Sequence, residues 1–208
     1  MAVHQIAKGL DIPLAGAPAP EVDDARAPRR VALVAADFVG LKPSLLVKPG
    51  DRVLRGAALV EDRAVPGVRH TAQAAGTVVA VHRGERRALQ SIVIDVAPDD
   101  GPGAQVRFAA FTGAAPDTLD GAAVRALLVE SGLWTALRAR PFSRVPAPDA
   151  SPHALFVTAT DTRPHAPDPQ RVIAARRDDF AAGVTALARL TEGTTYVCKA
   201  VGADVAAP

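Results

Sequence analysis

The chain has 208 residues, 44 of them alanine, and its 24 Lys and Arg nearly balance its 22 Asp and Glu. Its longest apolar run, residues 31–36, is far shorter than the ~20 residues of a membrane-spanning helix, and the balanced charge shows no footprint for nucleic acid. The single cysteine, Cys198, excludes an internal disulfide and cannot by itself hold zinc or an iron–sulfur cluster, so the composition indicates a soluble, intracellular chain of mixed α and β structure.

The first part of the chain divides into an arm and a β-rich unit. Residues 1–30 contain several prolines and little periodicity, which predicts an extended arm with one short ordered piece at 8–13. Residues 31–98 consist of short β-rich runs, each bounded by Gly, Pro or charged turn residues, and this pattern is typical of a small all-β domain. The runs are 31–34, 44–47, 57–60, 77–81 and 91–96.

An internal repeat lies within the β-rich unit. The segment VKPGDR at 47–52 is echoed by VHRGER at 81–86, and its glycines suit turn positions with positive φ. Two similar halves predict a quasi-two-fold β sandwich, the architecture of biotinyl and lipoyl carrier domains. The midpoint of the repeat falls near Ala64, where no lysine is present, because the four lysines are Lys8, Lys42, Lys48 and Lys199. The sequence therefore argues against a covalent carrier.

Residues 99–150 are predicted to form a helical segment followed by a proline-rich connector. Residues 106–111 could add a strand, after the polar break at 98–103. Asp120 has the side chain of a helix N-cap, and the apolar spacing that follows predicts a helix that continues to Glu130 and ends at Gly132. The prolines of 141–148 exclude a helix or a central strand there.

Residues 151–208 are predicted to form an incomplete α/β domain. The apolar run 154–158 indicates a strand, Asp168 and Pro169 begin a helix that Gly193 terminates, and 195–198 indicates a second strand. Such a β-α-β unit has parallel strands. No helix follows to cover the second strand, so we expect a loosely packed C-terminal third and a chain that corresponds to the front half of a longer protein.

The sequence lacks the familiar catalytic motifs. It has no phosphate-binding glycine loop, no nucleophile elbow, no zinc-binding H-E-x-x-H and no dinucleotide fingerprint. We interpret Cys198 as a buried structural thiol and the five scattered histidines as surface or loop residues. The histidines are His4, His70, His82, His153 and His165.

Eleven short segments, among them GAP at 16–18, lie in the same order along the chain as in the A subunit of the sodium-translocating NADH:quinone reductase, which the chain resembles. The most specific are ESGLWTALR at 130–138 and RPFS at 140–143; the others lie at 8–13, 16–18, 40–44, 47–53, 76–79, 83–87, 89–91, 156–159 and 196–199. The resemblance implies a barrel-sandwich hybrid followed by a Rossmann-like α/β domain.

The resemblance also implies a function. The A subunit is a peripheral component on the cytoplasmic face of the bacterial inner membrane, in a six-subunit complex that oxidises NADH, reduces ubiquinone to ubiquinol and exports sodium. It carries no flavin and no iron–sulfur cluster, and it is associated with ubiquinone binding. The expected partners are therefore ubiquinone and the other subunits of the complex.

Five residues are candidates for quinone contact. Trp134, Arg138, Arg140 and Phe142 combine aromatic surface with permanently charged donors, a set suited to a quinone ring and its carbonyl oxygens. Lys199 ends the second α/β strand, where ligands bind in open sheets. In the alternative interpretation, the two aromatic residues anchor the connector and the arginines pair with acids.

Two other functions remain open from the sequence. The chain could be a structural docking module without quinone contact, a truncated paralogue. It could also be the related C subunit of an electron-transport complex that couples ferredoxin and NAD, although that protein needs cysteine-rich cluster motifs and a glycine-rich flavin loop, which these residues lack.

Overall fold

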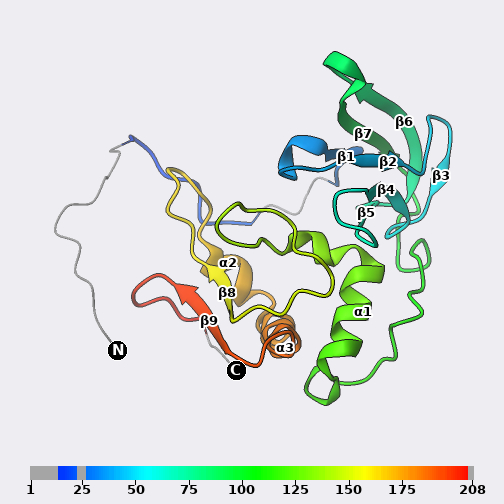
Figure 1. Ribbon diagram of the computed structural model, residues 1–208. Helices are drawn as coiled ribbons and strands as arrows, with labels where there is room; N and C mark the ends of the chain where they lie inside the picture. The colour runs from blue at the N-terminus through cyan, green and yellow to red at the C-terminus, as the bar shows by residue number, and fades with distance from the viewer. Residues whose placement is uncertain (1–13, 23–26, 206–208) are drawn as a thin grey trace.

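The computed structural model describes residues 14–22 and 27–205 (Figure 1). Most of the predicted arm, including its ordered piece at 8–13, lies outside these residues. Within them, no helix has the length and apolarity to cross a bilayer.

The β-rich unit forms two sheets around one core. A four-stranded sheet has the order β1-β7-β6-β3 and a three-stranded sheet the order β2-β4-β5, with all neighbours antiparallel. Buried residues of both sheets, including Leu33, Leu59 and Ile92, form one apolar cluster, which confirms the predicted β sandwich. The strands are β1 (Arg30–Val34), β2 (Pro43–Leu45), β3 (Arg52–Val53), β4 (Ala58–Asp62), β5 (Arg69–Thr71), β6 (Gly76–Arg83) and β7 (Leu89–Val96).

The two copies of the repeat use their glycines differently. Gly50 has φ 95°, as the turn was predicted to require. Gly84 has φ −97°, and Arg86 and Arg87 take the positive φ values in that turn instead. The turn of the β4–β5 hairpin contains Ala64, the midpoint of the repeat.

The middle of the chain is mainly helical. Helix α1 (Gly121–Ser131) begins at Asp120, whose Oδ1 accepts the Ala123 N–H at 2.7 Å, and ends at Gly132 with φ 80°, as predicted. Short 3₁₀ turns lie at η3 (Pro116–Thr118) and η4 (Leu133–Ala136). The strand expected at 106–111 is absent from this described region, because the Ala109 and Ala110 N–H groups bond to the Glu130 carboxylate rather than to a strand.

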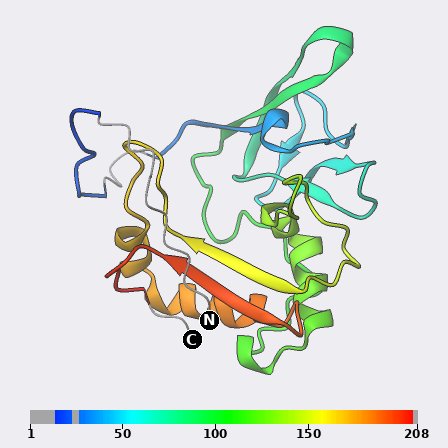
Figure 2. The same ribbon diagram turned by 60° about the vertical axis from the view of Figure 1, so that its left-hand side comes forward.

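The C-terminal part forms the predicted parallel β-α-β unit. Strands β8 (Ala154–Ala159) and β9 (Thr194–Lys199) pair in parallel register. The single predicted helix is broken at Arg176 into α2 (Pro169–Ala174) and α3 (Arg177–Ala188). Figure 2 shows the two strands side by side with both helices on one side of them. Phe156, which stacks on Tyr196 at 5.0 Å, is 64% exposed, so the other face of this pair has an uncovered aromatic patch.

A second apolar cluster joins the sandwich to the rest of the chain. It contains Val68 from the β4–β5 turn, Val124 from α1 and Leu190 after α3, together with Trp134 and Val145. Thr71 of β5 also donates to the Ser131 carbonyl of α1 at 3.1 Å. The β sandwich and the helical segment therefore hold one another in place around Trp134.

Candidate functional site

Trp134 lies in the interior and not at a surface site. Its side chain is 2% exposed, and its Nε1–H donates to the Pro146 carbonyl at 2.8 Å. The Arg125 guanidinium lies 5.2 Å from the ring centroid, and it also donates to the carbonyls of Pro148 and Ala150. These contacts anchor the proline-rich connector to α1, and they leave no face of the indole open to a ligand.

Arg138 lies against Phe38, a residue that the sequence did not single out. Its guanidinium carbon is 5.3 Å from the Phe38 ring centroid, a cation–π contact. The guanidinium also donates to the carbonyls of Thr135, Leu137 and Asp37, the last two at 2.9 and 3.4 Å. Arg138 therefore ties the connector to η1 (Ala35–Asp37), the turn that follows β1.

The other three candidates lie apart from this contact. Arg140 and Phe142 belong to an exposed loop that the Ala139–Arg144 bridge closes, and Phe142 is 73% exposed. Lys199 ends β9, and its Nζ donates to the Val205 carbonyl at 2.8 Å. Across residues 14–22 and 27–205, no hydrogen bond, ion pair or ring contact joins these three to Trp134 or Arg138. These contacts therefore do not bring the five residues together into one site.

Phe38 forms part of the wall of a cavity of about 700 Å³ beside the turn end of the β6–β7 hairpin, here called the hairpin cavity. Its floor is largely apolar, whereas three arginines, Arg63, Arg83 and Arg87, contribute positive charge. One of them is partly engaged, because Arg83 Nη1 donates to the Arg87 carbonyl at 3.0 Å. The other lining residues are Val34, Ala35, Ala36, Gly40, Leu41, Pro43, Ala88, Leu89 and Gln90. An apolar cavity with a few permanent donors is the usual form of a small-molecule site.

His70 supports Phe38 from inside the sandwich. The two rings meet edge to face at 4.3 Å, and the imidazole is 1% exposed. Burial lowers the pKa of His70, the nearby Asp62 carboxylate opposes this effect, and the positive charge of Arg138 adds to it. The expectation of a surface or loop histidine is therefore wrong here, because β5 turns this side chain into the core between exposed Arg69 and half-buried Thr71.

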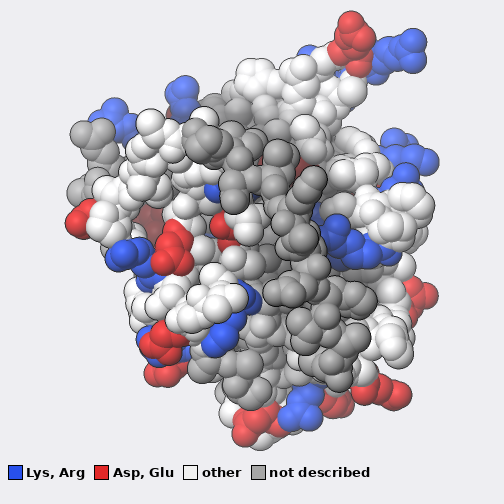
Figure 3. Space-filling model, turned by 90° about the vertical axis from the view of Figure 1, so that its left-hand side faces the viewer, with Lys and Arg blue, Asp and Glu red and all other residues white. Residues whose placement is uncertain are grey.

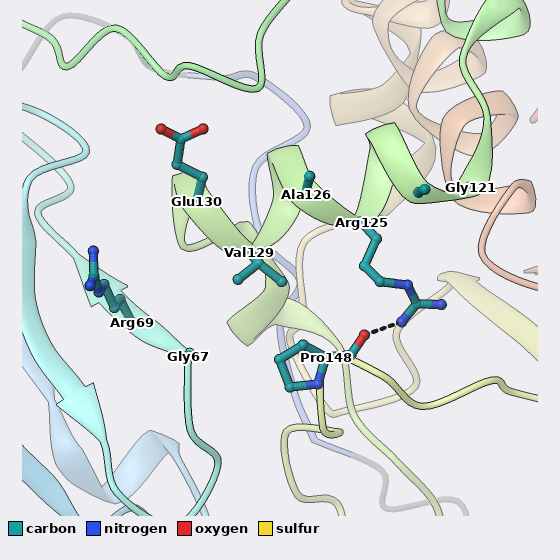
Figure 4. A pocket seen from close by; sticks show the side chains of 9 residues that line it. Gly67, Arg69, Gly121, Arg125, Ala126, Val129, Glu130 and Pro148 are labelled. Carbon is teal, nitrogen blue, oxygen red and sulfur yellow. Dashed lines mark hydrogen bonds between the residues drawn. The ribbon is translucent and has the colours of Figure 1, made fainter.

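A second cavity, the α1 groove, has a volume of about 570 Å³ and lies between α1 and the β4–β5 hairpin (Figure 4). Its charged groups are largely engaged with the protein backbone. Arg125 is held by the connector carbonyls, and Glu130 accepts the Ala109 and Ala110 N–H groups at 2.9 and 2.8 Å, which lowers the pKa of its carboxyl. Of the charged residues that line this groove, Arg69 is the one whose side chain makes no hydrogen bond or ion pair within the described ranges.

The hairpin cavity is the better candidate site, and sequence reasoning named none of its lining residues as site residues. Arg83 and Arg87 fall in a segment that carried the family resemblance, and their clustering in a turn was a usable signal. Phe38 and Arg63 gave no signal, because only the packing of η1 and the β4–β5 turn brings them to the same wall. No group of three or more His, Cys, Asp or Glu residues suited to a metal ion occurs in the part of the chain that the structure describes. The arrangement offers an aromatic wall and cationic donors, and so it is suited to binding rather than to acid–base chemistry.

Comparison with known proteins gives two family matches and close relatives. The model of the NqrA N-terminal barrel-sandwich hybrid domain matches residues 4–97, and that of the NqrA second alpha/beta domain matches 119–208. The A subunit of the Na(+)-translocating NADH-quinone reductase of Shewanella amazonensis is 49% identical over 202 residues, which are 97% of this chain and 45% of that protein. The same protein of Neisseria meningitidis serogroup B is 48% identical over 201 residues, 97% of this chain and 44% of the relative.

The matches fit the two architectures seen in the structure. The chain spans about 45% of the length of the curated relatives it matches. Along that span, both the β sandwich and the β-α-β unit fall within the matched domains of one family. The chain belongs to the NqrA family, which comprises the A subunits of the Na(+)-translocating NADH-quinone reductases.

Proposed function

We propose that this chain contributes a quinone-binding surface to a sodium-pumping NADH:ubiquinone oxidoreductase, without itself transferring electrons. Its partners are ubiquinone and the other subunits of the complex, and its place is the cytoplasmic face of the bacterial inner membrane. It binds no flavin and no iron–sulfur cluster of its own. In this proposal residues 31–98 form the barrel-sandwich domain, 99–150 the helical connector and 151–208 part of a Rossmann-like domain, after an arm at 1–30.

The observation that carries the proposal is the contact of Arg138 with Phe38 at the wall of the hairpin cavity. A quinone has a flat ring, two carbonyl acceptors and an apolar tail. The Phe38 ring supplies an apolar surface for the quinone ring, and the cavity guanidinium groups supply donors that stay charged at any physiological pH. A hydrogen bond from a charged donor contributes about 1.5–3 kcal/mol, enough to orient the carbonyls.

The roles of the residues differ from the first interpretation. Arg138 acts as a positioning residue, because it holds Phe38 and η1 against the connector. Trp134 supports the site indirectly, because Phe38 packs against the apolar cluster that contains Trp134. Arg140, Phe142 and Lys199 have no part in this site.

Photoaffinity labelling with a quinone analogue that carries a photoreactive ring tests the proposal. We expect the labelled peptides to come from 34–41 and 83–90, and an excess of unmodified ubiquinone to suppress the labelling. Labelling that the competitor does not suppress, or that lies on the exposed loop at Phe142, would contradict the proposed site.

A docking module without quinone contact is the second candidate. The burial of Trp134 and the engagement of Arg138 by three backbone carbonyls favour it, because both residues already have structural roles. This candidate predicts no specific label anywhere on the chain, so the same experiment separates the two functions.

A further inference from the structure

The end of the β6–β7 hairpin, here called the hairpin tip (residues 83–87), concentrates positive charge. Arg83, Arg86 and Arg87 lie within five residues, with Glu85 as the single acid, and all four side chains are exposed. Within the described residues, no ion pair neutralises these arginines. Figure 1 shows the hairpin projecting from the rest of the molecule, and Figure 3 shows charged side chains of both signs gathered at the end of this projection.

The backbone of the tip keeps arginine where glycine would be less strained. Arg86 has φ 52° and Arg87 has φ 61°, the left-handed region that non-glycine residues rarely adopt. The glycine of the same turn, Gly84, has φ −97° and so does not relieve this strain. Strain kept at an exposed turn is typical of a functional segment. Compared with glycine at the same two positions, Arg86 and Arg87 give this turn two more guanidinium groups.

The tip and the hairpin cavity form one continuous surface. Arg83 and Arg87 belong to the tip and also line the cavity, whose floor includes Phe38, Leu41 and Leu89. An acidic protein surface would engage the arginines alone. An anionic phospholipid would engage both parts, since its phosphate pairs with guanidinium groups and its apolar portion suits the floor.

We propose that the hairpin tip docks on an anionic phospholipid surface, with Arg83, Arg86 and Arg87 on the lipid phosphates. Docking in this way places the hairpin cavity beside the bilayer, from which a lipid-soluble molecule can enter it. The docking rests on the arginines of the tip and on the apolar floor of the cavity, and only this consequence for quinone entry rests on the proposed function.

Vesicle sedimentation with the full chain tests the docking. We expect the chain to bind vesicles that contain about 30% phosphatidylglycerol more tightly than pure phosphatidylcholine vesicles, and added salt to weaken this binding. The variant R86G/R87G removes two charges while glycine keeps the left-handed turn. Its affinity should fall about 25-fold, because each of the two arginines near an anionic leaflet contributes about fivefold. R86K/R87K restores the charge and should bind as the wild type does.

The charge-matched control is R52Q/R107Q, which removes two exposed arginines from outside the tip. It should keep nearly all the binding. Equal binding to both kinds of vesicle, unchanged binding by R86G/R87G, or an equal loss in R52Q/R107Q would overturn the proposal. Absence of vesicle binding, together with a failure of R86G/R87G to assemble with the other proteins of the complex, would also overturn it and would assign the tip to an acidic protein surface. Failure of quinone labelling leaves the docking unaffected.

Discussion

Replacing Trp134 by phenylalanine tests whether this residue anchors the connector or contacts a ligand. The indole is buried, donates to the Pro146 carbonyl and faces the Arg125 guanidinium. The change removes the hydrogen bond, about 1 kcal/mol, weakens the cation–π contact by about 0.5 kcal/mol and leaves a small cavity that costs about 1 kcal/mol. We therefore expect W134F to lower the free energy of unfolding by about 2–3 kcal/mol.

Urea unfolding followed by far-ultraviolet circular dichroism measures this loss. With a slope of about 2 kcal/mol per molar urea, the midpoint should fall by about 1–1.5 M. The matched control is F142L, since Phe142 is highly exposed and its replacement should change stability by less than about 0.5 kcal/mol. If W134F keeps its stability but loses quinone labelling, the anchoring role is refuted and Trp134 is a ligand contact.

Three further predictions concern the buried His70, the turn at Arg86 and the β8–β9 pair. Burial lowers the pKa of His70, so below its ordinary value of 6.5 the unfolded chain binds the proton more readily than the folded chain. The free energy of unfolding should therefore decrease as the pH is lowered, by up to about 1.4 kcal/mol per pH unit. H70Q should flatten that slope in melts between pH 5 and 7, and an unchanged slope would show that other groups cause it. The variant R86G should raise the free energy of unfolding by about 1 kcal/mol, because glycine relieves the strain of the left-handed backbone at this position. A lower midpoint of thermal unfolding in R86G than in the wild type would contradict this. Hydrogen exchange should be faster in β8 and β9 than in β6 and β7, because one face of the two-stranded sheet has uncovered aromatic residues; equal protection would count against this.

Elements with strong local signals were predictable from the sequence. Asp120 and Gly132 fix both ends of α1 through a side-chain cap and a left-handed residue, and neither depends on distant contacts. The break between α2 and α3 at Arg176 has no proline or glycine to mark it. Strand β3 has only two residues, and its pairing with β6 alone defines it.

The site depended on contacts that sequence patterns do not encode. A strand at 106–111 was a reasonable prediction from composition, but the Glu130 side chain accepts two of its backbone N–H groups, those of Ala109 and Ala110, instead. Phe38 acquires its role only where Arg138, 100 residues further along the chain, and the core residue His70 meet its ring. The functional interpretation of Trp134 was limited for the same reason, because the residue pattern alone does not distinguish a buried aromatic anchor from an exposed ligand contact.

Binding of a short-chain ubiquinone, followed by the fluorescence of Trp134, tests the central claim most directly, because Trp134 is the only tryptophan and Phe38 packs against its cluster. The variant A36F places a ring in the hairpin cavity, and A122F places the same ring in the α1 groove. We expect saturable quenching in the wild type and in A122F, and its loss in A36F. Equal quenching in A36F and the wild type would contradict a quinone site in the hairpin cavity.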